Sequence, residues 1–120
     1  PPRSTLFPYT TLFRSVRAGL SQLFDSPNPP DGLFAATDKH ALQAIEFCKA
    51  RGVAIPERLS IVGYDNISES AIASPPLSTI ESFPSRCGVE AVRLLIESQS
   101  GDKSGVDCLI EPELIVRGSS

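Results

Sequence analysis

A short run of branched apolar residues, Leu59, Ile61 and Val62, leads into the polar pair Asp65-Asn66. No charged residue interrupts the run before Asp65, and its apolar positions do not alternate strictly with polar ones. Such a run is typical of a strand that is covered on both faces of a parallel sheet. The pattern therefore predicts a strand over residues 59–64 inside an α/β domain.

Helical patterns precede this strand. Residues 16–25 repeat apolar side chains at helical spacing, and the proline-rich segment 26–30 breaks that helix. A short apolar strand follows over 32–36. A second helix then begins at Asp38, whose carboxylate can accept hydrogen bonds from the free amides of the first turn. Its apolar stripe consists of Ala41, Leu42, Ala44, Ile45 and Cys48, and Gly52 is a suitable left-handed residue to end it.

The rest of the chain predicts smaller elements. Residues 66–76 form a loop or a short helix, and 77–80 form a third strand. A third helix begins at Pro84, and its apolar side chains, which we expect to point inward, are Val89, Val92, Leu95 and Ile96. A polar loop at 98–105 precedes segment 107–117, where Pro112 lacks an amide donor and so favours an edge or crossover strand. Together these elements predict a three-layer α/β fold, a mostly parallel open sheet with flanking helices.

Residues 1–15 differ from the remainder. The peptide TLFPYTTLFRS at 5–15 matches the translation of a widely used sequencing-library adapter. We therefore expect 1–15 to be non-native read-through and 16–120 to be one partial domain, with the true start of the protein missing. The alternative is a genuine edge strand that carries aromatic side chains.

Composition narrows the class of protein. The chain has 120 residues, is 41% hydrophobic and 21% charged, and fits at most one domain. Two of its 11 basic residues, Arg3 and Arg14, precede residue 16, so 16–120 carries 9 basic and 14 acidic groups. No basic stripe occurs, and we expect no duplex DNA to bind this segment alone. Three isolated cysteines indicate reduced, buried thiols in a cytoplasmic protein.

The sequence offers no catalytic pattern. It lacks the glycine-rich phosphate-binding motifs and the GxSxG motif, and its single histidine, His40, has no evident serine or paired cysteine partner. We expect no enzyme activity, no cofactor, no metal, and neither a membrane span nor a signal peptide. Asp65 keeps two interpretations. It is either a local turn residue or a group that faces a ligand beyond the carboxyl end of its strand.

Three segments, PDGLFAATDKHALQAIEFCKARGVAIPERLSIVGYDNI (30–67), SPPLSTI (74–80) and EPELIVRGSS (111–120), resemble the effector-binding domain of LacI/GalR-type bacterial transcriptional regulators. That domain has the fold of the periplasmic sugar-binding proteins, and the LIVRGS pattern favours the regulators. The resemblance covers 16–120. It implies the C-terminal subdomain of a periplasmic-binding-protein-like fold that is truncated at its N-terminus, and it implies a homodimer.

The resemblance also implies effector-binding residues. Thr37 matches a position that is often Asn in the family, and its single hydroxyl offers less than an amide. Asp65 matches the acid that accepts hydrogen bonds from effector hydroxyls or amines, which suits an acceptor-only carboxylate and a sugar. Ser82 falls at a polar pocket position that is often Gln.

The implied dimer surface comprises Lys39, His40, Ile67 and Ile72, although Ile72 could also belong to the core. An intact member carries a helix-turn-helix head, a hinge helix and a first core subdomain before this region. Operator DNA would therefore bind to a head that this chain lacks, and the effector would lie between two subdomains. The alternative is a fragment of a periplasmic solute-binding protein, which an upstream signal peptide would reveal.

Overall fold

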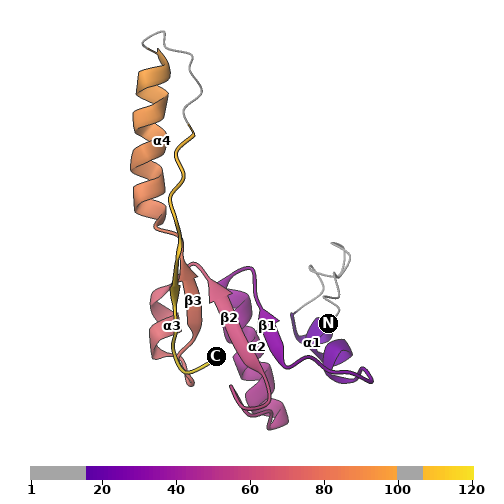
Figure 1. The fold of residues 1–120 in the computed structure, drawn as a ribbon. Coiled ribbons are helices and arrows are strands. Elements are labelled where there is room, and N and C mark those ends of the chain that lie inside the picture. Colours follow the sequence, from indigo (N-terminus) through magenta and orange to yellow (C-terminus); the bar gives the residue numbers. More distant parts are fainter. Residues whose placement is uncertain (1–15, 100–106) are drawn as a thin grey trace.

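A computed structural model describes residues 16–99 and 107–120, and the read-through prediction for 1–15 lies outside them. The elements in chain order are α1 (Val16–Phe24), β1 (Gly32–Phe34), α2 (Asp38–Arg51), β2 (Ser60–Tyr64), α3 (Ser68–Ile72), β3 (Ser78–Glu81), α4 (Pro84–Gln99) and β4 (Glu113–Ile115). Most of the loop predicted at 98–105 also falls outside the described residues. Figure 1 shows a body formed by α1–α3 and the sheet, from which α4 projects as an arm.

The sheet has the strand order β1-β2-β3-β4. Strands β1, β2 and β3 are parallel, while β4 runs antiparallel to β3 at the edge. This confirms the predicted mostly parallel open sheet with flanking helices. Pro112 directly precedes β4, so its missing amide falls before the paired residues of an edge strand.

The two faces of the sheet differ in burial. One face carries Leu59, Ile61 and Leu77, which are fully buried in a core shared with α2 and with Leu20 of α1. On the opposite face, Phe34 is 60% exposed and Val62 is half-buried. The prediction that strand 59–64 is covered on both faces is therefore wrong among the described residues, which supply no third layer over this face.

Helix α2 is capped at both ends, but the residue that caps its start is Thr37 and not the predicted Asp38. The side chain of Thr37 caps the helix by accepting a hydrogen bond from the backbone amide of His40 at 3.3 Å. Gly52 ends the helix at φ 66°, as predicted, and its amide donates to the carbonyl of Lys49. The predicted capping role of Asp38 is wrong, because its side chain points into the body instead.

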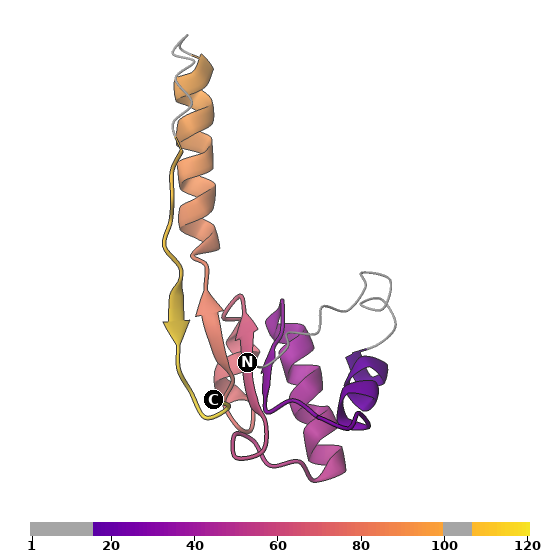
Figure 2. The same ribbon diagram turned by 45° about the vertical axis from the view of Figure 1, so that its right-hand side comes forward.

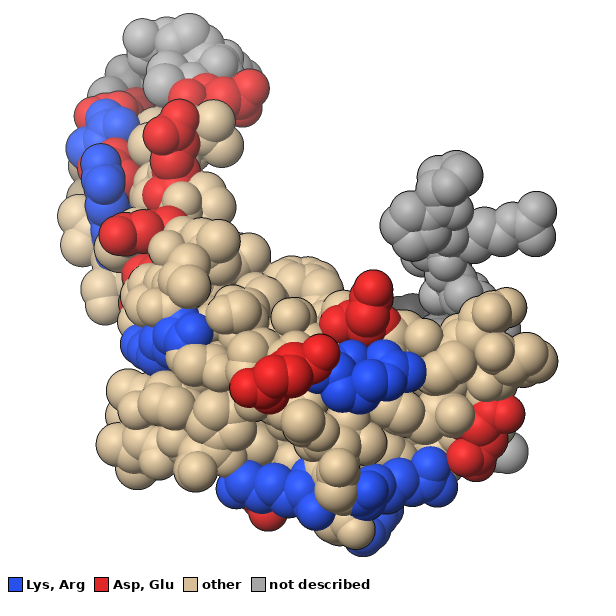
Figure 3. All heavy atoms as spheres, turned by 60° about the horizontal axis from the view of Figure 1, so that its bottom comes forward, with Lys and Arg blue, Asp and Glu red and all other residues tan. Residues whose placement is uncertain are grey.

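Helix α4 and segment 107–112 run side by side beyond the carboxyl ends of the parallel strands in both views of the ribbon (Figures 1 and 2). The apolar residues of α4 that were predicted to point inward are between 57% and 67% exposed, namely Val89, Val92, Leu95 and Ile96. The prediction that they point into the core is wrong, because helical spacing identifies an apolar face but not the surface that covers it. Arg93 pairs with Glu90 and Glu97 along the arm, where Figure 3 shows both signs of charge together.

A serine far along the sequence connects β2 and β3. The buried Ser119 donates from Oγ to the carbonyl of Ile61 at 2.6 Å and accepts from the amide of Ser78 at 2.8 Å. Its own carbonyl accepts from the amide of Ile61 at 2.7 Å. One residue of the closing segment therefore satisfies backbone groups of two neighbouring strands.

The cysteines divide by environment. Cys48 lies in the core, where burial raises the pKa of its thiol. Cys87 and Cys108 are exposed, so the prediction of buried thiols holds only for Cys48. They lie on α4 and beside it, and they are exposed for the same reason as the apolar side chains of the arm. In the described part of the chain, no helix has the length and apolar character needed to cross a membrane.

Candidate functional site

Thr37, Asp65 and Ser82 follow the carboxyl ends of three neighbouring parallel strands, β1, β2 and β3. Phe34 pairs with Val62, so Thr37 and Asp65 each lie three residues beyond a matched position. The carboxyl ends of parallel strands share one edge of the sheet, and ligands of open α/β sheets bind there. The sheet therefore brings the three predicted effector residues to the same edge.

The hydroxyl of Thr37 is already engaged within α2. It accepts from the amide of His40 at 3.3 Å and lies 3.0 Å from Nδ1 of the same residue. A hydroxyl has one donor and two acceptor positions. Where Nδ1 of His40 accepts from this hydroxyl, Thr37 keeps one free acceptor position, which suits a ligand group that donates.

Asp65 is exposed and lies in an uncommon backbone conformation. Its φ is 114°, and that of the following Asn66 is 52°. Its backbone amide donates to the carbonyl of Ile80 at 2.9 Å, whereas its carboxylate forms no hydrogen bond with another described residue. An exposed carboxylate on a strained turn can accept two donors from a ligand.

A polar network lies behind this turn. The amide group of Asn66 donates from Nδ2 to Glu81 at 2.9 Å and accepts at Oδ1 from Arg117 at 2.8 Å. Glu81 also accepts from the amide of Phe83 at 2.7 Å, and the pKa of its carboxyl is lowered, first by Asn66 and then by Phe83. Arg117 donates in addition to the carbonyl of Leu77 at 2.7 Å. The network joins the turn after β2 to the base of the α4 arm and to the closing segment.

Asp38 is a fully buried carboxylate in the first turn of α2. It accepts from Oγ of Ser70 at 2.6 Å, from Oγ1 of Thr79 at 2.5 Å and from the amide of Ile67 at 3.0 Å. The charge is stabilised by three donors, since no basic side chain of the described residues pairs with it. Asp38 thereby ties α2 to α3 and β3.

Ser82 is half-buried in the link between β3 and α4. Its carbonyl accepts from Sγ of Cys87 at 3.4 Å. The next residue, Phe83, has a φ of 52°, so the backbone turns sharply where the arm begins. Ser82 therefore lies at the junction of body and arm.

The predicted dimer residues differ in accessibility. Lys39 and His40 are exposed on the first turn of α2. Ile72, at the end of α3, is 84% exposed, so the alternative that it belongs to the core is wrong. Ile67 is half-buried, and its amide is held by Asp38.

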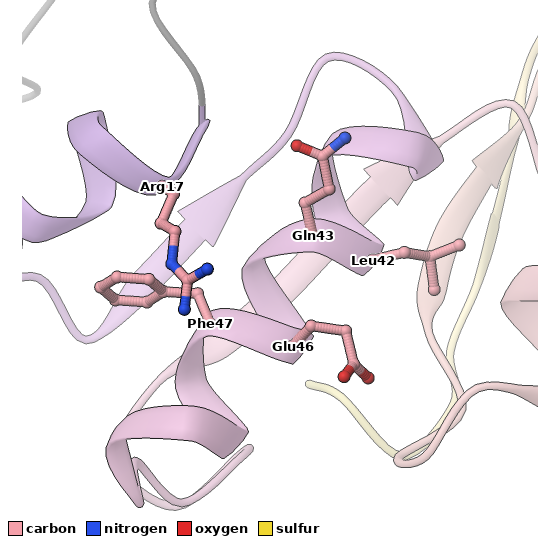
Figure 4. A pocket seen from close by; sticks show the side chains of 5 residues that line it. All are labelled: Arg17, Leu42, Gln43, Glu46 and Phe47. Carbon is pink, nitrogen blue, oxygen red and sulfur yellow. The ribbon is translucent and has the colours of Figure 1, made fainter.

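A separate hollow of about 410 Å³ lies between α1 and α2. Figure 4 shows its lining side chains, which are Arg17, Leu42, Gln43, Glu46 and Phe47. None of the predicted effector residues lines it. In the described ranges, no group of three or more His, Cys, Asp or Glu side chains is arranged to hold a metal ion.

Sequence reasoning missed the roles that four residues have at this edge, namely Asp38, Asn66, Glu81 and Arg117. A signal existed for Asp38, because Asp38, Ala41, Ile45 and Cys48 follow helical spacing along the buried stripe of α2. A charged residue on an apolar stripe requires internal partners. The other three had no comparable signal, because their contacts join segments that are distant in the sequence.

Comparison with known proteins places this geometry in a family. A family profile described as a periplasmic binding protein-like domain matches residues 5–120. The HTH-type transcriptional repressor CytR of Escherichia coli strain K12 is 38% identical over 109 residues, which cover 90% of this chain and 32% of that protein. The chain thus spans about a third of the length of this curated relative.

Solved structures of regulators have the same fold. The transcriptional regulator CelR in complex with cellobiose matches with a TM-score of 0.79 and 32% identity, over 89% of this chain and 33% of that one. A lac repressor dimer bound to operator and an anti-inducer matches with a TM-score of 0.80 and 25% identity, over 88% of this chain and 37% of that one. The profile covers nearly the whole chain, and the chain therefore belongs to the periplasmic binding protein-like domain family, in the form found in LacI-type regulators.

Proposed function

We propose that this chain is the C-terminal part of the sensor domain of a LacI/GalR-type transcriptional regulator. In the intact protein it would bind a small-molecule effector, a sugar or a related metabolite rich in hydroxyl groups. The observation that carries the proposal is the exposed carboxylate of Asp65 at the same edge of the sheet as Thr37 and Ser82, which follow the neighbouring strands. The resemblance to CelR, which was solved with cellobiose, supports the sugar class.

Two further surfaces support the rest of the proposed assembly. The exposed apolar side of α4 suits packing against the first core subdomain, so that the effector would close a cleft between the two subdomains. The exposed side chains of Lys39, His40 and Ile72 suit a dimer contact. Closure would shift the pose of the DNA-binding heads, a coupling between sites typically worth about 1–3 kcal/mol.

Calorimetry on the intact protein tests the binding role. The protein is titrated with a panel of mono- and disaccharides that includes cellobiose, and Asp65→Asn is compared with the wild type. Loss of charge-assisted hydrogen bonds worth about 1.5–3 kcal/mol should lower the affinity for the saccharide by roughly 10- to 150-fold. Asp31→Asn is the control, because Asp31 is an exposed acid just before β1, at the opposite edge of the sheet.

Two results would contradict the proposal. Unchanged affinity in Asp65→Asn would remove Asp65 from the site, and a wild-type protein that binds no saccharide of the panel would remove the sugar class. The regulatory role is tested separately by footprinting the intact protein on genomic DNA, with and without the bound saccharide. Protection that does not respond to the saccharide would refute the coupling.

A further inference from the structure

The turn between β2 and α3 requires support, because two consecutive residues of it have positive φ. Asp65 lies at 114° and Asn66 at 52°, and neither is glycine. Such conformations are unfavourable for residues other than glycine and persist where the surrounding structure fixes them. Whatever fixes this turn also determines where the carboxylate of Asp65 points.

Two consecutive amides just after Asp65 are held by one buried carboxylate. The amide of Ile67 donates directly to Oδ2 of Asp38 at 3.0 Å. The amide of Asn66 donates to Oγ1 of Thr79 at 3.3 Å, and that hydroxyl donates in turn to Oδ1 of Asp38 at 2.5 Å. Asp38 thus contacts Ile67 directly and Asn66 through one hydroxyl.

The direction of these bonds is fixed by chemistry. An ionised carboxylate only accepts, so Thr79 gives its single proton to Asp38 and presents a lone pair to the amide of Asn66. The carboxylate cannot move aside easily. It is fully buried, and Gly63 of β2 leaves space for it where a side chain would collide. The strand therefore approaches the carboxylate closely enough to hold it against the turn.

We propose that Asp38 is the positioning residue of the effector site: through Thr79 and the amide of Ile67, it holds the Asp65–Asn66 turn in the shape that presents Asp65. This inference rests on the function proposed above and adds a residue that touches no effector. A purely structural role, in which Asp38 only ties α2 to α3, would need Ser70 as much as Thr79. The two hydroxyls therefore separate the interpretations.

Amide hydrogen exchange on the intact protein tests the proposal without any effector. Asp38→Asn is the obvious change, but it disturbs all three donors at once and cannot separate Thr79 from Ser70. Thr79→Val removes only the relaying hydroxyl at nearly constant volume. Peptides spanning 64–68 should exchange at least tenfold faster in Thr79→Val and at the wild-type rate in Thr79→Ser, which keeps the hydroxyl. Peptides from the centre of α2 should be unchanged in both.

Ser70→Ala is the matched control. It removes a hydroxyl that donates to the same carboxylate but does not contact the turn, so exchange at 64–68 should stay within twofold of the wild type. Equal loosening in Ser70→Ala and Thr79→Val, or no loosening in Thr79→Val, would overturn the proposal.

Saccharide titration links the inference to binding and keeps the two proposals distinguishable. For the saccharide that the wild type binds, affinity should fall at least tenfold in Thr79→Val and recover in Thr79→Ser. If Asp65→Asn loses binding while Thr79→Val retains it, the positioning role fails and the proposed site stands. If Thr79→Val loosens the turn while Asp65→Asn binds normally, the proposed site fails and the support of the turn stands.

Discussion

Replacing Gly63 with Ala should be strongly destabilising, although it adds a single methyl group. Gly63 lies in β2 and faces the buried carboxylate of Asp38. An added Cβ would collide with Oδ1 of Asp38 and would lie 3.1 Å from a methyl carbon of Leu77. The flexible Leu77 can adjust, but the carboxylate is held by three donors and cannot retreat without losing at least one of them.

The cost has two parts. Overpacking a core typically costs about 1–3 kcal/mol. A lost hydrogen bond to a buried charged group costs about 1.5–3 kcal/mol more. We therefore expect Gly63→Ala to lower the free energy of unfolding by roughly 2.5–6 kcal/mol, a large part of the 5–15 kcal/mol available to a typical domain.

Urea unfolding of the intact protein, followed by circular dichroism, measures this change. Gly32→Ala is the control, because Gly32 lies in the neighbouring strand β1 with open space around it. That change should be neutral or stabilise by up to about 1 kcal/mol. A cost below about 1 kcal/mol in Gly63→Ala would refute the steric reasoning.

A double-mutant cycle identifies the colliding partner. Asp38→Ala removes the carboxylate, so the methyl group of Ala at position 63 would then occupy vacated space. The cost of Gly63→Ala should fall by at least about 1 kcal/mol in that background, within the range known for contacting residues. An additive cycle would mean that Leu77, or the strand itself, causes the effect.

Three further outcomes are expected. Gly52→Ala should lower the free energy of unfolding in urea by about 1–2 kcal/mol, because the backbone at φ 66° is left-handed and an added Cβ is strained there. Asn66→Ala should raise the lowered pKa of Glu81 toward its ordinary value in a carbon-detected NMR titration, and an unmoved pKa would contradict this. The stabilisation from Glu81 is present above the pKa that it has in the unfolded chain, and it is lost as the pH falls through the lowered pKa of the folded protein. Iodoacetamide should label Cys87 in the native protein but Cys48 only after unfolding, and early labelling of Cys48 would contradict its burial.

Local patterns predicted most elements of the body to within a few residues. The strand predicted at 59–64 forms over Ser60–Tyr64. Helix α2 is capped by Gly52, because the left-handed conformation at that position favours glycine. Such features depend on neighbours in the sequence. They could therefore be predicted before any contact between distant segments was known.

Features that depend on distant contacts could not be predicted in the same way. The apolar spacing correctly predicted the helix α4, but no residue pattern in that helix indicates that it leaves the body after Phe83. The strand ends gave the positions of Thr37 and Asp65, whereas the partners of Asp38 and Asn66 lie 13 to 51 residues away. Those partners follow from the sheet topology, and a single sequence does not specify them.

The bridging role of Ser119 has a consequence for biosynthesis. When β2 and β3 have been synthesised, Ser119, whose hydroxyl joins Ile61 to Ser78 across the two strands, has not yet been added to the chain. Those backbone groups must therefore stay bound to water while about forty further residues, which include the arm, are translated. Closure of the sheet around Ser119 can therefore occur only after the arm and the segment that follows it have been synthesised.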